Sequence, residues 1–211
     1  MKFASRKEAG RQLANYLVRR GLAADLVLGL PRGGVVVAAE VARELKLPLD
    51  VLVVRKIGHP RQREFAIGAL AEPDFVFIND APLRDFPAAL AELDDVVSEE
   101  RRRLREYRRR FHLSPMPIFE GKRLLLVDDG LATGATAEAA AISLRQQNAG
   151  RIIIAAPVAS VESVERLRRV ADDVEVLSAD PDFAAVGQFY DEFSQTTDEE
   201  VISLLRQRPP A

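Results

Sequence analysis

Two adjacent carboxylates, Asp128 and Asp129, mark the place in the 211-residue chain where chemistry is most strongly indicated. Four apolar residues, 124–127, lead up to them, and a loop of small and hydroxyl residues follows. Such a run predicts a buried strand whose carboxyl end carries the two acids, and open α/β sheets bind their ligands at that end. The loop after the acids can wrap backbone N–H groups around an anion, and a helix that begins there adds its positive dipole.

The loop contains the residue types that a phosphate monoester requires. Thr133 and Thr136 can donate hydroxyl hydrogen bonds, and Gly134 lets the backbone approach a ligand closely. The two carboxylates would face the sugar side of such a ligand and accept hydrogen bonds from vicinal hydroxyls. Together, the loop and the acids predict a site for a 5-phosphorylated ribose. The alternative is a solvated Asp-Asp turn that caps a helix.

Residues 124–136, LLLVDDGLATGAT, resemble the phosphoribosyl pyrophosphate (PRPP) signature of the type I phosphoribosyltransferases. The resemblance implies an enzyme, a pentosyltransferase that transfers 5-phosphoribosyl from PRPP to an unidentified nitrogenous base and releases pyrophosphate. It implies that Asp128 and Asp129 are the catalytic residues and bind the ribose 2- and 3-hydroxyls. It implies Mg²⁺ as the cofactor, held mostly by PRPP oxygens with help from the same two acids. The 5-phosphate would be bound by Ala132, Thr133, Gly134, Ala135 and Thr136.

The sequence PRGG at 31–34 follows another apolar run and agrees with this interpretation. Its glycines expose backbone N–H groups, and Arg32 offers a guanidinium fork for phosphate. By resemblance, Arg32, Gly33 and Gly34 bind pyrophosphate, in a loop that often contains a cis peptide bond before a residue other than proline. The alternative is a tight turn between a strand and a helix.

A second basic position, Arg55-Lys56, ends the next predicted strand, where the family often has a cation near pyrophosphate. Neighbouring side chains on a strand point to opposite faces, so only one of the two is expected to reach the site. Lys56 is the preferred candidate, and Arg55 is the alternative.

Residues 57–82 take the place of a flexible loop that closes over PRPP in the family. The stretch predicts a hairpin that turns at residues 72–74 and carries His59, Arg61, Arg63 and Glu64 as polar candidates for a lid. An exposed hairpin with no catalytic part is the alternative. The wider insertion, 57–122, is longer than the compact loops of familiar salvage enzymes.

A long charged helix is predicted at 88–111, with seven arginines between residues 101 and 110. The arginines suggest a surface for nucleic acid, but acidic residues precede them, and Glu99–Arg103 and Glu106–Arg110 have the spacing of helical ion pairs. A solvated or dimer-facing helix is therefore the preferred interpretation, and a nucleic-acid partner is not expected.

The two ends of the chain are expected to form a small hood that holds the acceptor base. By resemblance, the base would contact Val158, Phe189 and Tyr190, because an aromatic ring can stack on a heterocycle. The same residues could instead form the core of the hood.

Alternation of apolar runs and amphipathic segments predicts the elements that position these residues. The fold class is α/β: an open, mostly parallel, doubly wound sheet with helices on both faces, plus a hairpin lid and a small hood. We expect a single domain over 1–211 with its core at about 24–180. Strands are predicted at 25–30, 49–56, 123–129, 151–159 and 174–179, and helices at 5–20, 35–46, 137–148, 160–171 and 197–207.

Composition excludes several other classes of protein. Without cysteine, and with His59 and His112 as its two histidines, the chain has no thiolate or histidine-rich metal site. No apolar run approaches the length of a membrane span and no signal peptide is evident, which predicts a cytoplasmic protein. The net charge of −2 gives no global attraction for nucleic acid. The family resemblance suggests a homodimer.

Two other functions use the same motifs. A regulatory protein could keep the fold and bind PRPP as an effector, with the arginine-rich helix as a nucleic-acid surface. A phosphoribosyl hydrolase or phosphorylase could run the same chemistry with another nucleophile.

Overall fold

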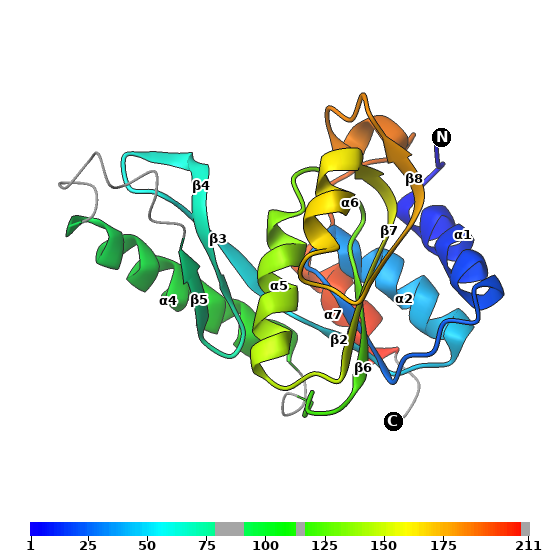
Figure 1. Ribbon diagram of the computed structural model, residues 1–211, viewed down its shortest axis with the longest axis horizontal. Coiled ribbons are helices and arrows are strands. Elements are labelled where there is room, and N and C mark those ends of the chain that lie inside the picture. Colours follow the sequence, from blue (N-terminus) through cyan, green and yellow to red (C-terminus); the bar gives the residue numbers. More distant parts are fainter. Residues whose placement is uncertain (79–90, 113–116, 208–211) are drawn as a thin grey trace.

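The computed structural model describes residues 1–78, 91–112 and 117–207, and it contains two sheets (Figure 1). The larger is a five-stranded parallel sheet with helices on both faces, which is the predicted α/β fold. In Figure 1 the smaller, antiparallel sheet extends to the left of the larger one. The first residues of the predicted helix, 88–90, lie outside the described residues.

Apolar runs form the parallel sheet, as their sequence predicts. Its strands lie in the order β2 (Leu49–Val51), β1 (Leu26–Gly29), β6 (Arg123–Val127), β7 (Arg151–Ser160) and β8 (Asp173–Asp180), and all neighbours are parallel. The three central strands, β1, β6 and β7, are buried almost throughout, because helices cover both faces. Since β1 and β6 are neighbours, the loops that follow them meet at one edge of the sheet.

Successive side chains of each strand point to opposite faces of the parallel sheet, and a different set of helices packs on each face. Val27, Leu125 and Ile153 pack on one face, with α1 (Arg6–Arg19), α2 (Gly33–Leu45) and α7 (Asp198–Arg206). Leu28 and Leu126 pack on the other, with α5 (Ala135–Gln146) and α6 (Val161–Leu167). Among the described residues, none of the helices combines the length and apolarity needed to cross a membrane.

The predicted strand at 49–56 is wrong in one respect, because the chain changes sheets within it. Residues 49–51 form β2 of the parallel sheet, whereas β3 (Val54–His59) belongs to the smaller sheet. At the change, the Leu52 amide donates to the Gly29 carbonyl, and the Glu72 amide donates to the Val53 carbonyl. Both sheets bury the residues at this point, so the sequence stays apolar there. The apolar pattern therefore does not indicate that the chain passes from one sheet to the other.

The predicted hairpin is confirmed. In the smaller sheet β4 (Gln62–Ala71) pairs with β3 and β5 (Phe75–Ile78), both antiparallel, and the β4–β5 turn falls at residues 72–74. The long helix α4 (Leu93–Phe111) packs on this sheet, with Leu104 and Phe111 buried.

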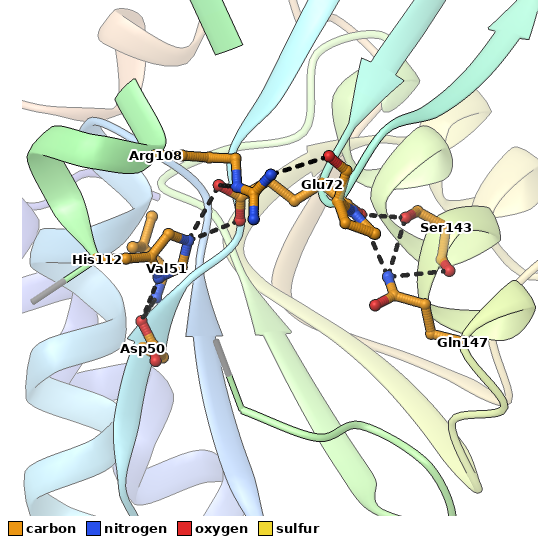
Figure 2. A network of polar contacts seen from close by, with 8 residues as sticks. Asp50, Val51, Glu72, Arg108, His112, Ser143 and Gln147 are labelled. Atoms are coloured by element: carbon orange, nitrogen blue, oxygen red, sulfur yellow. Dashed lines mark hydrogen bonds and ion pairs between the residues drawn. The ribbon is translucent and has the colours of Figure 1, made fainter. Parts of the chain in front are cut away.

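A buried carboxylate ties the smaller sheet and α4 to the parallel sheet. The side chain of Glu72 is fully buried, and Figure 2 shows it pointing toward Arg108 of α4 and toward His112, which directly follows that helix. Its Oε2 lies 2.8 Å from Nε2 of His112, and its Oε1 lies 3.6 Å from Nε of Arg108. On the other side of the imidazole, Nδ1 lies 3.5 Å from the carboxylate of Asp50 in β2.

The backbone of Glu72 extends the same network to α5. Its carbonyl oxygen accepts hydrogen bonds from the Ser143 hydroxyl at 2.6 Å and from the Gln147 side-chain amide at 3.2 Å (Figure 2). Because Ser143 belongs to α5 and Gln147 directly follows it, the hairpin turn is joined to both α4 and α5.

Arginines of α4 have acidic partners both within the helix and on another helix. The predicted pair Glu99–Arg103 is present at 2.7 Å. Arg110, however, binds Asp198 at the start of α7, where Glu106 was expected as its partner. Tertiary packing brings the buried carboxylate of Asp198 to Arg110, which helical spacing cannot predict.

Candidate functional site

Both acids lie directly beyond the carboxyl end of β6, as predicted. The Asp129 amide donates to Oδ1 of Asp128 at 2.8 Å, which holds the two residues in a tight turn. The loop at 31–34, which follows the neighbouring strand β1, packs against this turn. The PRGG loop and the acidic pair, which are far apart in the sequence, are therefore in direct contact.

The glycines of the PRGG loop are required by the acids themselves. A Cβ on Gly33 would overlap Oδ2 of Asp129 and lie 2.7 Å from its Cγ. A Cβ on Gly34 would lie 2.8 Å from both Oδ1 of Asp128 and the Val127 carbonyl oxygen. The peptide bond between Pro31 and Arg32 is cis, and α2 begins at Gly33, so its first amides lie at this edge of the sheet.

The electrostatics of the two acids differ. Burial, reinforced by the charge of Asp129, raises the pKa of Asp128 well above its ordinary value. Asp129, in contrast, makes an ion pair with Arg6 of α1, whose Nε lies 2.6 Å from Oδ2. The site thus holds one carboxyl group that binds a proton readily and one that has a cationic partner.

The loop after the acids is exposed where an anion would approach it. Ala132, Thr133 and Thr136 are exposed, and Gly134 has a φ of 70°, a conformation that favours glycine. Gly134 is also the N-cap of α5, so the amides of the first turn point out of the helix here without intrahelical acceptors. This geometry suits a phosphate group.

Two serines at the start of α6 bind the backbone of the loop that follows the acids. Ser160 donates its hydroxyl to the Ala132 carbonyl at 2.7 Å and accepts a hydrogen bond from the Ser163 amide at 3.0 Å. Ser163 donates its own hydroxyl to the Leu131 carbonyl at 2.9 Å. Ser160 is therefore the N-cap of α6, and its hydroxyl has a second function in fixing the loop.

Replacing Ser160 with alanine is expected to lower the free energy of unfolding by about 1–2 kcal/mol, the usual effect of losing an N-cap. Urea unfolding would measure it. Ser98→Ala, at an exposed position of α4, is the matched control and should change stability by less than about 0.5 kcal/mol. Equal stability of both variants would contradict the capping role.

The cations predicted to bind pyrophosphate lie in different surroundings. Arg32 is 3.6 Å from Asp198 of α7. Arg55 donates to Glu100 at 2.9 Å and lies over the ring of Tyr107, so it faces α4. Lys56 is exposed on the opposite face of β3. The alternation of Arg55 and Lys56 is thus as expected, while their role toward pyrophosphate stays a prediction.

Arg55 lines an open cavity of about 740 Å³ beside α4. Its lining residues in the described chain are mostly cationic: Arg55, Arg103, Glu106, Tyr107, Arg109 and Arg110. The candidate lid residues lie toward the same helix. Arg61 is 3.4 Å from Glu92, and Arg63 is 3.3 Å from Glu99. The side chain of Glu64 lies outside the described residues.

The two ends of the chain meet beside the acids. The Phe3 amide donates to the Phe189 carbonyl, and the Asp191 amide donates to the Phe3 carbonyl, each at 2.8 Å. Val158, Phe189 and Tyr190 are buried in the cluster that these segments form. Phe193 is 40% exposed, so solvent reaches this aromatic side chain. The proposed contact of a base with the three buried residues stays a prediction.

Tyr190 also contacts the acidic turn. Its hydroxyl donates to the backbone carbonyl of Asp129 at 2.6 Å. Burial, together with the nearby charge of Asp129, raises the pKa of this hydroxyl far above its ordinary value, so it remains a donor at neutral pH. Tyr190 therefore holds the backbone of the turn that contains Asp128 and Asp129.

Arg6 and Asp198 are site residues that the motifs did not predict. Arg6 lies 123 positions before its partner Asp129, and nothing in its local sequence distinguishes it from the other cations of the amphipathic first helix. From the sequence, Asp198 is an acidic residue in the first turn of a predicted helix. In the structure it also binds Arg32 and Arg110, which belong to two other parts of the chain. Three-dimensional contact is the signal that identifies both.

The described residues hold no group of three or more histidines and carboxylates that could bind a metal ion by themselves. Asp128 and Asp129 are a pair of oxygen donors at the mouth of the site. Such a pair fits a magnesium ion whose remaining ligands come from a phosphorylated substrate and water.

Comparisons with known proteins agree with this geometry. A family model described as a phosphoribosyl transferase domain matches residues 4–193. Two Mycobacterium tuberculosis proteins, of strains CDC 1551 and H37Rv, carry the provisional name phosphoribosyl transferase and are 44% identical over 207 residues. The match covers 96% of this chain and 46% of each relative, so the chain spans about half the length of these curated relatives. A protein of known crystal structure from Thermus thermophilus is 45% identical, with a TM-score of 0.81 and coverage of 97% and 98% of the two chains.

Proposed function

The chain belongs to the phosphoribosyl transferase family, and we propose that it transfers the 5-phosphoribosyl group of PRPP to a nitrogenous base and releases pyrophosphate. One observation carries the proposal: Asp128 and Asp129 lie between two anion-binding loops, one at 31–34 and one at 132–136. A molecule with a diol between two phosphorylated ends matches that arrangement.

In the proposed reaction the chain binds PRPP at both ends, the 5-phosphate and the pyrophosphate. The loop at 132–136 and the first turn of α5 bind the 5-phosphate, and the loop at 31–34 binds pyrophosphate. Asp128 and Asp129 accept hydrogen bonds from the ribose hydroxyls. The bond between C1 and the pyrophosphate oxygen breaks, its electron pair leaves with pyrophosphate, and a nitrogen of the base forms a new bond to C1.

The carboxylates also stabilise the positive charge that develops on the sugar. Because this charge appears only as the bond to pyrophosphate breaks, negative groups fixed beside the ring lower the barrier. The raised pKa of Asp128 suits it to accept the proton that the attacking nitrogen loses.

Mg²⁺ would be held by the carboxylates of Asp128 and Asp129 together with PRPP oxygens. When bound, it would neutralise charge on the departing pyrophosphate. We also propose, from the family resemblance, that the chain forms a homodimer. The cytoplasmic location stays a prediction from the sequence.

Pyrophosphate release from PRPP and Mg²⁺, screened across purine and pyrimidine bases, tests the proposal. Release that depends on one base, and that falls about a hundredfold or more in an Asp128→Asn/Asp129→Asn variant, is the expected result, because two hydrogen bonds to charged groups are lost. The acceptor that supports release identifies the substrate.

Two other outcomes would replace the proposal with another function. PRPP binding by calorimetry without release with any base would favour a protein that senses PRPP. Release at a steady rate without any base would favour a phosphoribosyl hydrolase.

A further inference from the structure

Arg6 connects three parts of the candidate site. Its Nε donates to Oδ2 of Asp129 at 2.6 Å, and its Nη1 donates to the Ser194 carbonyl at 2.7 Å. Its guanidinium carbon lies 3.9 Å from the centre of the Phe193 ring. The side chains of Arg6 and Asp129 are 12% and 14% exposed, so water screens their ion pair only weakly.

The geometry of a guanidinium explains why these contacts occur together. Its planar fork can donate in two directions while its face lies on an aromatic ring. The Phe193 ring stacks in turn against Tyr190, with centroids 5.2 Å apart. Arg6 thus cannot rotate away from Asp129 without also leaving Phe193 and Ser194.

As a result, three of the four polar groups of Asp129 are held. Arg6 binds Oδ2 of the carboxylate, Tyr190 donates to the backbone carbonyl, and the backbone amide donates to Asp128. Gly33 lies against the same Oδ2, so the carboxylate has little room to move. The oxygen Oδ1 is the one that these contacts leave for a further hydrogen bond.

We propose that Arg6 is a positioning residue for ribose recognition, which orients the Asp129 carboxylate so that Oδ1 accepts a hydrogen bond from a sugar hydroxyl. This inference rests on the proposed function, because it assumes that Asp129 binds the ribose diol. Arg6 lies beside Gly33 of the loop at 31–34, but on this proposal it touches neither the 5-phosphate loop nor the reacting atoms. Its removal should therefore weaken ligands that contain the sugar far more than those without it.

Two probes separate these effects: ribose 5-phosphate, which contains the diol, and inorganic pyrophosphate, which does not. In Arg6→Ala, titration calorimetry with Mg²⁺ present is expected to show ribose 5-phosphate binding weakened about tenfold, the effect of disturbing a hydrogen bond to a charged group. Pyrophosphate binding should weaken far less, and its retention also shows that the variant is folded.

A double-mutant cycle tests whether Arg6 acts through Asp129. In an Asp129→Asn background, Arg6→Ala should cause no further loss of ribose 5-phosphate affinity. The control Arg11→Ala changes an exposed arginine of the same helix, whose guanidinium is 3.7 Å from Glu40, and should leave both affinities as in the wild type.

Several results would overturn the inference. Equal weakening of both probes would mean a general structural role, and an undiminished effect in the Asp129→Asn background would mean that Arg6 acts by another route. Unchanged or tighter binding of ribose 5-phosphate would mean that Arg6 is dispensable or blocks the site. Failure of the wild-type chain to bind ribose 5-phosphate, PRPP or pyrophosphate would remove the proposed function, and the inference with it.

Discussion

Gly33→Ala is expected to reduce base-dependent pyrophosphate release by about a hundredfold, because a displacement of roughly 1 Å at reacting groups has effects of that size. The added Cβ would overlap Oδ2 of Asp129 and lie 2.8 Å from Nε of Arg6. Neither group can yield easily: the carboxylate is ion-paired, and Arg6 is stacked on Phe193. The carboxylate must therefore leave its position, or the loop at 31–34 must move away.

Steady-state assays of pyrophosphate release would measure this effect, with thermal unfolding to confirm that the variant is folded. Gly10→Ala is the matched control. Its Cβ would meet the Cβ of Glu40 at 2.8 Å, a milder steric conflict between α1 and α2 away from the acids. Loss of activity in both variants to the same extent would show that helix packing, and not the acid, explains the result for Gly33.

Between pH 6.5 and about 9, the free energy of unfolding is expected to fall by about 3 kcal/mol through the titration of His112. Burial alone would lower the pKa of His112, but the carboxylates of Asp50 and Glu72 outweigh it and raise the pKa to about 9. The folded chain thus keeps the proton to a higher pH than the unfolded chain, whose ordinary value is 6.5. The stabilisation is complete below pH 6.5 and is lost as the pH rises through 9.

Urea unfolding at several pH values across this range would test the prediction. His112→Gln keeps a hydrogen-bond donor without the charge, so it should remove most of the pH dependence and make the chain less stable at pH 6.5. His59→Gln changes the other histidine of the chain and should retain the slope. The same slope in both variants would mean that His112 is not the titrating group. The effect matters for the fold because the network of Glu72 and His112 joins the smaller sheet to the larger one.

Elements with strong local signals could be predicted from the sequence. Uninterrupted apolar runs indicated β1, β6 and β7, since strands buried on both faces need no polar alternation. The hairpin turn at 72–74 was indicated by its polar residues and proline. The break between β2 and β3 could not be predicted, because Leu52 and Val53 are buried at the passage from one sheet to the other.

By itself the sequence determined the α/β class, the position of the acids at a strand end, and both glycine-containing loops, because these depend on residues that are close together in the chain. The tertiary structure decided which side chains support the acids. Arg6 reaches Asp129, Tyr190 reaches its carbonyl, and Gly33 packs against its carboxylate from distant parts of the sequence. Helical spacing offered Glu106 as the partner of Arg110, but folding brought Asp198 to it. Contacts between distant segments depend on how the helices pack on the sheet, and short-range periodicity does not encode that arrangement.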